Sequence, residues 1–103
     1  MNEYETIFIM KNDITTEQQK EVIKKIKGYL NKHATIIHVE DLGLKKLAYE
    51  LRKCKTGYYY LIDFKGESSI IAELERRYRI NDNILKLFFS QISFVLSFEQ
   101  SLI

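Results

Sequence analysis

The run from Tyr58 to Phe64, with the sequence YYYLIDF, constrains the fold more than any other segment. Its aromatic and β-branched residues favour a strand. Tyr58, Tyr60, Ile62 and Phe64 fall on one side at period two and form an unbroken apolar face, while the other side is mixed. Because a fully apolar face must be covered by other elements, we expect this strand to be central in a sheet that is packed on one side.

Three further segments have the composition of strands: residues 4–10, 35–51 and 84–92. The second of these is interrupted at Gly43. No two-residue hairpin signal is present there, so we expect one long strand with a bulge or bend. A polar turn is predicted over residues 53–57. In the last strand, the residues expected to share a face are Leu85, Leu87 and Phe89.

Two segments have apolar residues at helical spacing. Thr15 and Gln18 fit a capping box, which predicts the start of the first helix. Its apolar side is then predicted at Val22, Ile23, Ile26 and Leu30. In the second helix the apolar side is predicted at Ile71, Leu74 and Tyr78.

The resulting order is β-α-β-β-α-β, of the α+β class. Right-handed crossovers place both helices on one face of a four-stranded antiparallel sheet, which is the ferredoxin-like split-βαβ arrangement. The length of 103 residues suits a single domain. The other face of the sheet is left open in this arrangement.

Composition excludes several classes of protein. Hydrophobic residues make up 46% of the chain, which is too many for intrinsic disorder, and one cysteine cannot form an internal disulfide. We expect no secretory signal and no membrane helix, and hence a protein of a reducing compartment. Sixteen Lys and Arg against fourteen Asp and Glu give a net charge of +2, so any nucleic-acid contact must use a local patch.

The sequence offers no convincing catalytic or metal site. His33 and His38 lie five residues apart without further ligands to complete a metal set. Cys54 is flanked by two lysines, but no histidine is placed by the sequence to act as its base. An acylphosphatase-like enzyme of this topology would need an anion-binding arginine loop after the first strand, where residues 11–13 read KND. We therefore expect neither an enzyme, nor a cofactor, nor a small-molecule substrate.

Basic residues are dense along the end of the second strand and the turn after it: Lys45, Lys46, Arg52, Lys53 and Lys55. Two interpretations remain open at this point. Such a run can hold phosphates, but edge strands also carry lysines simply to prevent aggregation. The arginines of the second helix, residues 76, 77 and 79, are expected to be solvated and paired with Glu73 and Glu75.

The tyrosine run raises the alternative of a free-standing RNA-recognition-like module, which stacks bases on aromatic residues of its third strand. The strand phase argues against it. Tyr58 and Tyr60 share the unbroken apolar face with Ile62 and Phe64, so they are expected in the core rather than exposed for stacking. A small-ligand regulatory domain of the same topology, dimerising through its sheet, is a further alternative.

The open face of the sheet is predicted to be apolar enough to bind a protein partner. The residues expected to form this face are Ile7, Ile9, Tyr59, Leu61 and Phe88, with Glu5 and Lys86 beside them. The other interpretation is that residues 93–103 fold back and cover the face. Of the two, we favour a protein partner.

Four blocks carry a resemblance to a known family: residues 4–5 (YE), residues 43–53 (GLKKLAYELRK), residues 57–58 (GY) and residues 79–86 (RINDNILK). With them the chain resembles the bacterial-type small-subunit (30S) ribosomal protein six family. The middle block is the most specific. The resemblance implies a ferredoxin-like ribosomal protein domain over residues 1–95 and a short C-terminal tail over residues 96–103.

The resemblance also implies a function. Members of this family lack catalytic activity and bind the central domain of small-subunit ribosomal RNA, paired with small-subunit ribosomal protein eighteen, during assembly. It favours the RNA interpretation for Lys45, Lys46, Arg52, Lys53, Lys55 and Lys86, and the partner interpretation for the open face. A cytoplasmic ribosomal protein is therefore expected, with an organellar ribosome as the other possible location.

Overall fold

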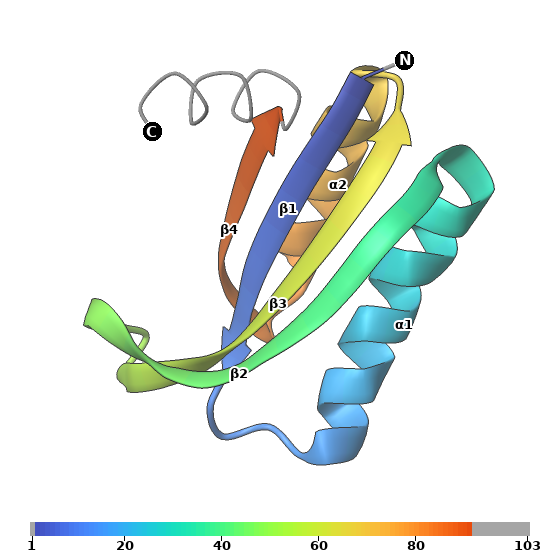
Figure 1. The fold of residues 1–103 in the computed structure, drawn as a ribbon. Helices are drawn as coiled ribbons and strands as arrows, with labels where there is room; N and C mark the ends of the chain where they lie inside the picture. The colour runs from blue at the N-terminus through green and yellow to red at the C-terminus, as the bar shows by residue number, and fades with distance from the viewer. Residues whose placement is uncertain (1, 92–103) are drawn as a thin grey trace.

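The structure is a computed structural model that describes residues 2–91. Its elements are β1 (Asn2–Lys11), α1 (Thr16–His33), β2 (Thr35–Leu51), β3 (Cys54–Gly66), α2 (Ser69–Ile80) and β4 (Ile84–Gln91). The strands form one antiparallel sheet in the order β2-β3-β1-β4, and both helices cover the same face of it (Figure 1). The predicted ferredoxin-like arrangement, with YYYLIDF in a central strand, is confirmed. The predicted tail, residues 96–103, lies outside the described residues.

The main core lies between this sheet and the two helices. Every second residue of β1 and of β3 points into this core. Phe8 of β1 and Phe64 of β3 are fully buried there, and Tyr60 is 7% exposed. Tyr58 is half-buried and packs against the same core. A polar pair is enclosed in it, in which the hydroxyls of Thr6 and Tyr78 are 3.1 Å apart and hydrogen-bonded.

Helix α1 begins where the sequence predicts. The capping box of α1 is complete: Thr15 Oγ1 accepts from the Gln18 backbone N–H at 3.1 Å, and Gln18 Oε1 accepts from the Thr15 N–H at 2.8 Å. In α2 the fully buried row is Ile70, Leu74 and Tyr78. Ile71, predicted in that row, is only partly buried, because the spacing of four places Ile70 above Leu74.

The prediction that Leu85 shares a face with Leu87 and Phe89 is wrong. The pairing of β1 with β4 shifts register between Ile9 and Met10, so that Met10 pairs with Ile84. The irregularity gives β4 an extra residue at its start. Ile84 therefore enters the main core, and Leu85 points to the opposite face of the sheet.

The β2–β3 hairpin is longer than the sequence predicts. The turn consists of Arg52 and Lys53, since Leu51 pairs with Cys54, and residues 54–57 belong to β3 rather than to a polar turn. Strand β2 is continuous through Gly43, as predicted, with register shifts at three places. In the last of these, β2 advances from Lys46 to Leu51 while β3 moves only from Thr56 to Cys54.

Candidate nucleic-acid and partner-protein surfaces

The end of the β2–β3 hairpin, residues 44–58, forms an arm that leaves the plane of the sheet; we call it the hairpin arm. It curves across the end of β1 towards the start of β4 (Figure 1). Bulges bend a strand and increase its twist, and the extra residues of β2 supply this bend. Under the arm lies a second small core of Ile9, Leu47 and Cys54, flanked by Leu51, Tyr59 and Leu85.

Polar contacts brace the hairpin arm against the rest of the chain. Lys86 Nζ of β4 donates a hydrogen bond to Tyr49 Oη at 2.7 Å, and its ammonium lies 5.1 Å from the centre of the Tyr49 ring. Arg52 Nη1 donates to the backbone carbonyl of Asp82 at 3.0 Å, in the loop between α2 and β4. The arm is thus fixed at its tip and along one side.

The hairpin arm presents the cations that the sequence singled out. Its five basic residues, all exposed, are Lys45, Lys46, Arg52, Lys53 and Lys55. The bend brings Lys86, which is distant in sequence and half-buried, beside them through its contact with Tyr49. The structure therefore gathers all six candidate RNA-binding residues around one projection of the fold.

The turn of the hairpin arm holds two cations in an unfavourable backbone conformation. Arg52 has φ +47° and Lys53 has φ +66°. Two-residue hairpin turns of this kind favour Asn and Gly, because a Cβ in the left-handed region is strained. Strain of this kind concentrates at functional sites. The presence of Arg and Lys here is therefore consistent with a role for their charges.

A cavity of about 500 Å³ beside the arm adds a cation that sequence reasoning set aside. Arg52, Lys86 and Arg79 of α2 all line it. Arg79 forms the predicted ion pair with Glu75, so its charge is partly offset. Its position next to the arm depends on the fold of the arm over β4, and no local pattern in the sequence signals it.

The open face of the sheet has an apolar centre. Ile7 pairs with Leu61 on one side and with Phe88 on the other, and Phe88 is 46% exposed. Tyr59 is half-buried beside them. Ile9 was expected on this surface, but it is only 2% exposed because the hairpin arm packs over it. Ile9 therefore packs beneath this surface and is not part of its exposed area.

Acidic side chains lie at the other end of the same face, a feature to which the sequence analysis gave no role. Asp63 pairs across the sheet with Glu5 on one side and His38 on the other. Burial raises the pKa of Asp63, the nearby carboxylates of Glu3 and Glu40 raise it further, and His38 opposes the shift. One carboxylate oxygen of Asp63, Oδ1, is buried without a hydrogen-bond partner among the described residues.

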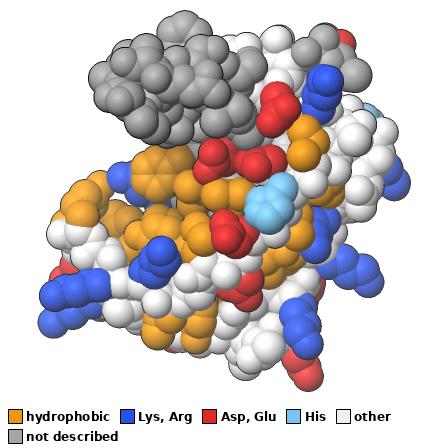
Figure 2. Space-filling model, in the orientation of Figure 1, with side chains coloured by type: hydrophobic (Ala, Val, Ile, Leu, Met, Phe, Trp, Pro, Cys, Tyr) orange, Lys and Arg blue, Asp and Glu red, His pale blue; other side chains and the backbone are white. Residues whose placement is uncertain are grey.

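Figure 2 views this open face directly. Hydrophobic side chains gather across its middle, acidic side chains lie above them and beside the His side chain, and Lys and Arg side chains lie at the lower left, towards the hairpin arm, and along the right edge. The face thus changes from acidic through apolar to basic along the strands. Such a surface suits a partner with both apolar and basic groups, next to a polyanion at the basic end.

The structure does not support base stacking on the third strand. Tyr60 is buried in the main core and Tyr58 packs against it, as the strand phase predicted. The two histidines lie apart: His33 packs against the Tyr29 ring with centroids 4.6 Å apart, and His38 lies opposite Asp63.

Residues 2–91 contain no group of three or more potential metal ligands. No helix in that part of the chain is long and apolar enough to cross a membrane.

Comparisons with known proteins agree with this fold. The family model described as Ribosomal protein S6 matches residues 3–90. The small ribosomal subunit protein bS6 of Helicobacter acinonychis (strain Sheeba) is 46% identical over 87 residues, which is 84% of this chain and 61% of the relative. This chain therefore spans about three-fifths of the length of that relative. The bS6 protein of Phocaeicola vulgatus is 44% identical over 87 residues, covering 84% of this chain and 76% of its own.

A solved structure has the same architecture. The crystal structure of 30S ribosomal protein S6 from Thermotoga maritima superposes with a TM-score of 0.86 at 25% sequence identity. The superposition covers 97% of this chain and 95% of the other.

Proposed function

Because this chain belongs to the ribosomal protein S6 family, we propose that it binds the central domain of small-subunit ribosomal RNA together with small-subunit ribosomal protein eighteen during assembly. The family consists of structural proteins of the small ribosomal subunit and not of enzymes. Its bacterial members belong to the cytoplasmic ribosome. The RNA target and the protein partner are the parts that we propose.

The observation that carries the proposal is the braced hairpin arm. Phosphate contacts give affinity without reading sequence, and they fix the orientation of a protein on the nucleic acid. The bonds from Lys86 to Tyr49 and from Arg52 to Asp82 hold the arm over β4, so its cations form one surface. Lysines placed only to protect a sheet edge would need no such bracing.

The partner is assigned to the open face. Ile7, Leu61 and Phe88 form its apolar centre beside the arm. A partner seated there would lie next to the RNA bound by the arm, and its own charges would add to the binding. This arrangement accounts for the net charge of only +2, which is low for a protein that grips RNA alone.

Titration of the protein onto the central-domain RNA junction, with and without protein eighteen, tests the proposal. We expect tight binding only when both proteins are present, and much weaker binding to unrelated single strands. Phe88→Asp should abolish the effect of the partner while leaving the fold intact, since this ring is exposed. Equally tight binding to unrelated strands, or a Phe88→Asp variant that still responds to the partner, would refute it.

A further inference from the structure

The two helices carry more positive charge than the whole chain. Helix α1 has five lysines against two glutamates, a net charge of +3, and α2 has three arginines against two glutamates, a net charge of +1. The chain as a whole has +2. The helix layer, which faces away from the open side of the sheet, is therefore a second basic surface, separate from the hairpin arm.

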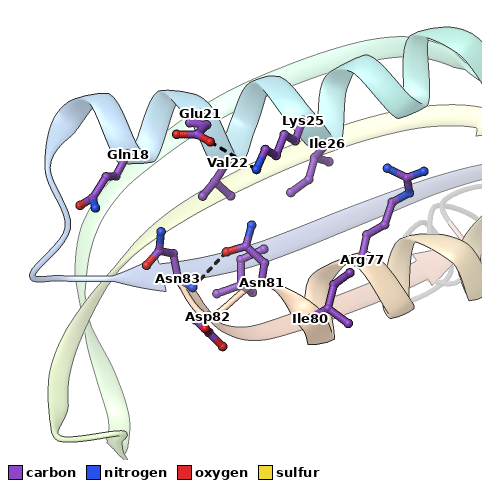
Figure 3. A pocket seen from close by; sticks show the side chains of 11 residues that line it. Gln18, Glu21, Val22, Lys25, Ile26, Arg77, Ile80, Asn81, Asp82 and Asn83 are labelled. Carbon is purple, nitrogen blue, oxygen red and sulfur yellow. Dashed lines mark hydrogen bonds and ion pairs between the residues drawn. The ribbon is translucent and has the colours of Figure 1, made fainter.

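An open groove runs between these helices. One part, of about 510 Å³, has an apolar floor that includes Val22 and Ile26 of α1 and Ile84 of β4. In Figure 3, Val22 and Ile26 point from α1 towards α2, and Arg77 points from α2 back towards α1. A second part, of about 550 Å³, continues from the first, because Glu21, Lys25 and Arg77 line both.

Cations predominate around the groove. Lys24, Lys25, Lys32 and Arg77 line its two parts, against the carboxylates of Glu21 and Asp82. Lys25 pairs with Glu21 at 3.3 Å. The groove therefore retains an excess of positive charge that suits a chain of phosphates.

Arg77 adds a flat surface at the point where the two parts of the groove meet. Its guanidinium carbon lies 4.3 Å from the centre of the Tyr29 ring, and the His33 ring packs against the same tyrosine. The Arg77 side chain remains 43% exposed. A guanidinium plane backed by an aromatic ring is a surface on which nucleic-acid bases stack.

We propose that this inter-helix groove binds a single-stranded RNA segment, with phosphates held by Lys24, Lys25 and Lys32 and a base stacked on Arg77. An acidic peptide would satisfy the lysines equally well, but it has no group that requires the flat face of Arg77. The combination of a basic groove with a stacking surface therefore favours RNA. This surface is independent of the hairpin arm and of the open face.

The test uses a full-length variant in which the hairpin arm is neutralised by Lys45→Gln, Lys46→Gln and Lys53→Gln, so that binding to the arm does not mask the groove. A fluorescent twelve-residue uridine RNA is titrated against it at several salt concentrations. Adding Lys24→Gln and Lys32→Gln should weaken binding about tenfold at low salt. It should also reduce the salt slope, which is the magnitude of the slope of log K against log salt concentration, by about 1.4, or about 0.7 for each lost phosphate contact. Lys20→Gln with Lys65→Gln removes the same charge outside the groove and should change the affinity less than about twofold.

The stacking contact is tested with Arg77→Lys, which keeps the charge but removes the plane. We expect a loss of about fivefold or more. Arg76→Lys is the matched control, because Arg76 pairs with the same Glu73 but does not line the groove, and it should change the affinity less than about twofold. Circular dichroism confirms folding of each variant.

Three results would overturn the proposal. The arm-neutralised protein could fail to bind the uridine RNA, the groove and control variants could lose affinity equally, or a polyglutamate peptide could compete as well as RNA does. Failure here leaves the proposed role of the hairpin arm untouched, since that role is measured on the junction RNA with the arm intact.

Discussion

The ammonium of Lys86 on β4 donates a 2.7 Å hydrogen bond to the hydroxyl of Tyr49, thirty-seven positions earlier in the sequence on the hairpin arm. The same ammonium lies over the rings of Tyr49 and Phe88, at 5.1 Å and 5.4 Å from their centres. One cation thus joins the basic arm to the apolar centre of the open face. The two proposed binding surfaces meet at this residue.

A double-mutant cycle should detect this contact. Tyr49→Phe removes the hydroxyl, and Lys86→Met removes the ammonium while keeping most of the side-chain length. We expect a coupling energy of about 0.5–1 kcal/mol in urea unfolding, since both groups are at least partly solvated. Additive effects of the two substitutions would show that the contact does not hold the arm in solution.

Substitutions in the turn of the hairpin arm should raise the stability of the chain and weaken its binding to RNA. Arg52→Asn with Lys53→Gly places residues that favour positive φ at both positions. We expect the free energy of unfolding to rise by about 1 kcal/mol, because the left-handed conformation is strained for Arg and Lys. Binding to the junction RNA should weaken at the same time. A variant that is more stable and binds RNA as tightly as the wild type would show that the charges of the turn do not contribute to RNA binding.

Two glycines should respond in opposite directions to alanine. A Cβ at Gly57 would lie 2.5 Å from Ile9 Cγ2 and 3.1 Å from the Met10 carbonyl oxygen. Ile9 is buried and the carbonyl belongs to β1, so Gly57→Ala should cost about 1–3 kcal/mol. Nothing lies within 4 Å of a Cβ at Gly28, and Gly28→Ala in the middle of α1 should stabilise the chain by about 0.5–1 kcal/mol.

Thermal unfolding of both alanine variants, followed by circular dichroism, measures the difference. If Gly57→Ala unfolds at the wild-type temperature, the hairpin arm does not pack over β1 as the structure has it.

Asp63 should make stability depend on pH. Burial raises its pKa in the folded chain, while in the unfolded chain the carboxyl titrates near its ordinary value of about 3.9. The folded state therefore holds the proton to higher pH, and the stability associated with that proton is present below about pH 4 and is lost as pH rises through the folded pKa. Asp63→Asn lacks this loss and should be more stable than the wild type at pH 7.

Urea unfolding of the wild type and of Asp63→Asn between pH 3 and pH 7 measures this effect. The advantage of the variant should shrink as the pH falls to about 4. An advantage that is the same at every pH would show that ionisation of Asp63 is not its cause.

The sequence predicted the order and type of the elements because these depend on local patterns. The period-two alternation of β3 identified its buried face, and Thr15 with Gln18 identified the start of α1. The errors lie where one element acts on another. The register shift that turns Leu85 away from the main core depends on pairing between β1 and β4, and no pattern within β4 predicts it.

The candidate site was predicted in composition but not in arrangement. The density of lysines identified the hairpin arm, and strand alternation identified most of the open face. The bend that buries Ile9 and brings Lys86 to Tyr49 arises from irregular pairing between β2 and β3. Of the acidic end of the open face, only Glu5 was predicted, because Glu5, Asp63 and His38 come together only across three strands.

The salt dependence of binding to the central-domain RNA junction, measured with protein eighteen present, tests the central claim most directly. The variant with Lys45→Gln, Lys46→Gln and Lys53→Gln is compared with Lys20→Gln, Lys27→Gln and Lys65→Gln, which removes three charges away from the hairpin arm. If the arm neutralises phosphates, the arm variant alone should lose about 2 from the salt slope, or about 0.7–0.9 for each lost contact. Equal slopes for the two variants would contradict the assignment of RNA binding to the hairpin arm.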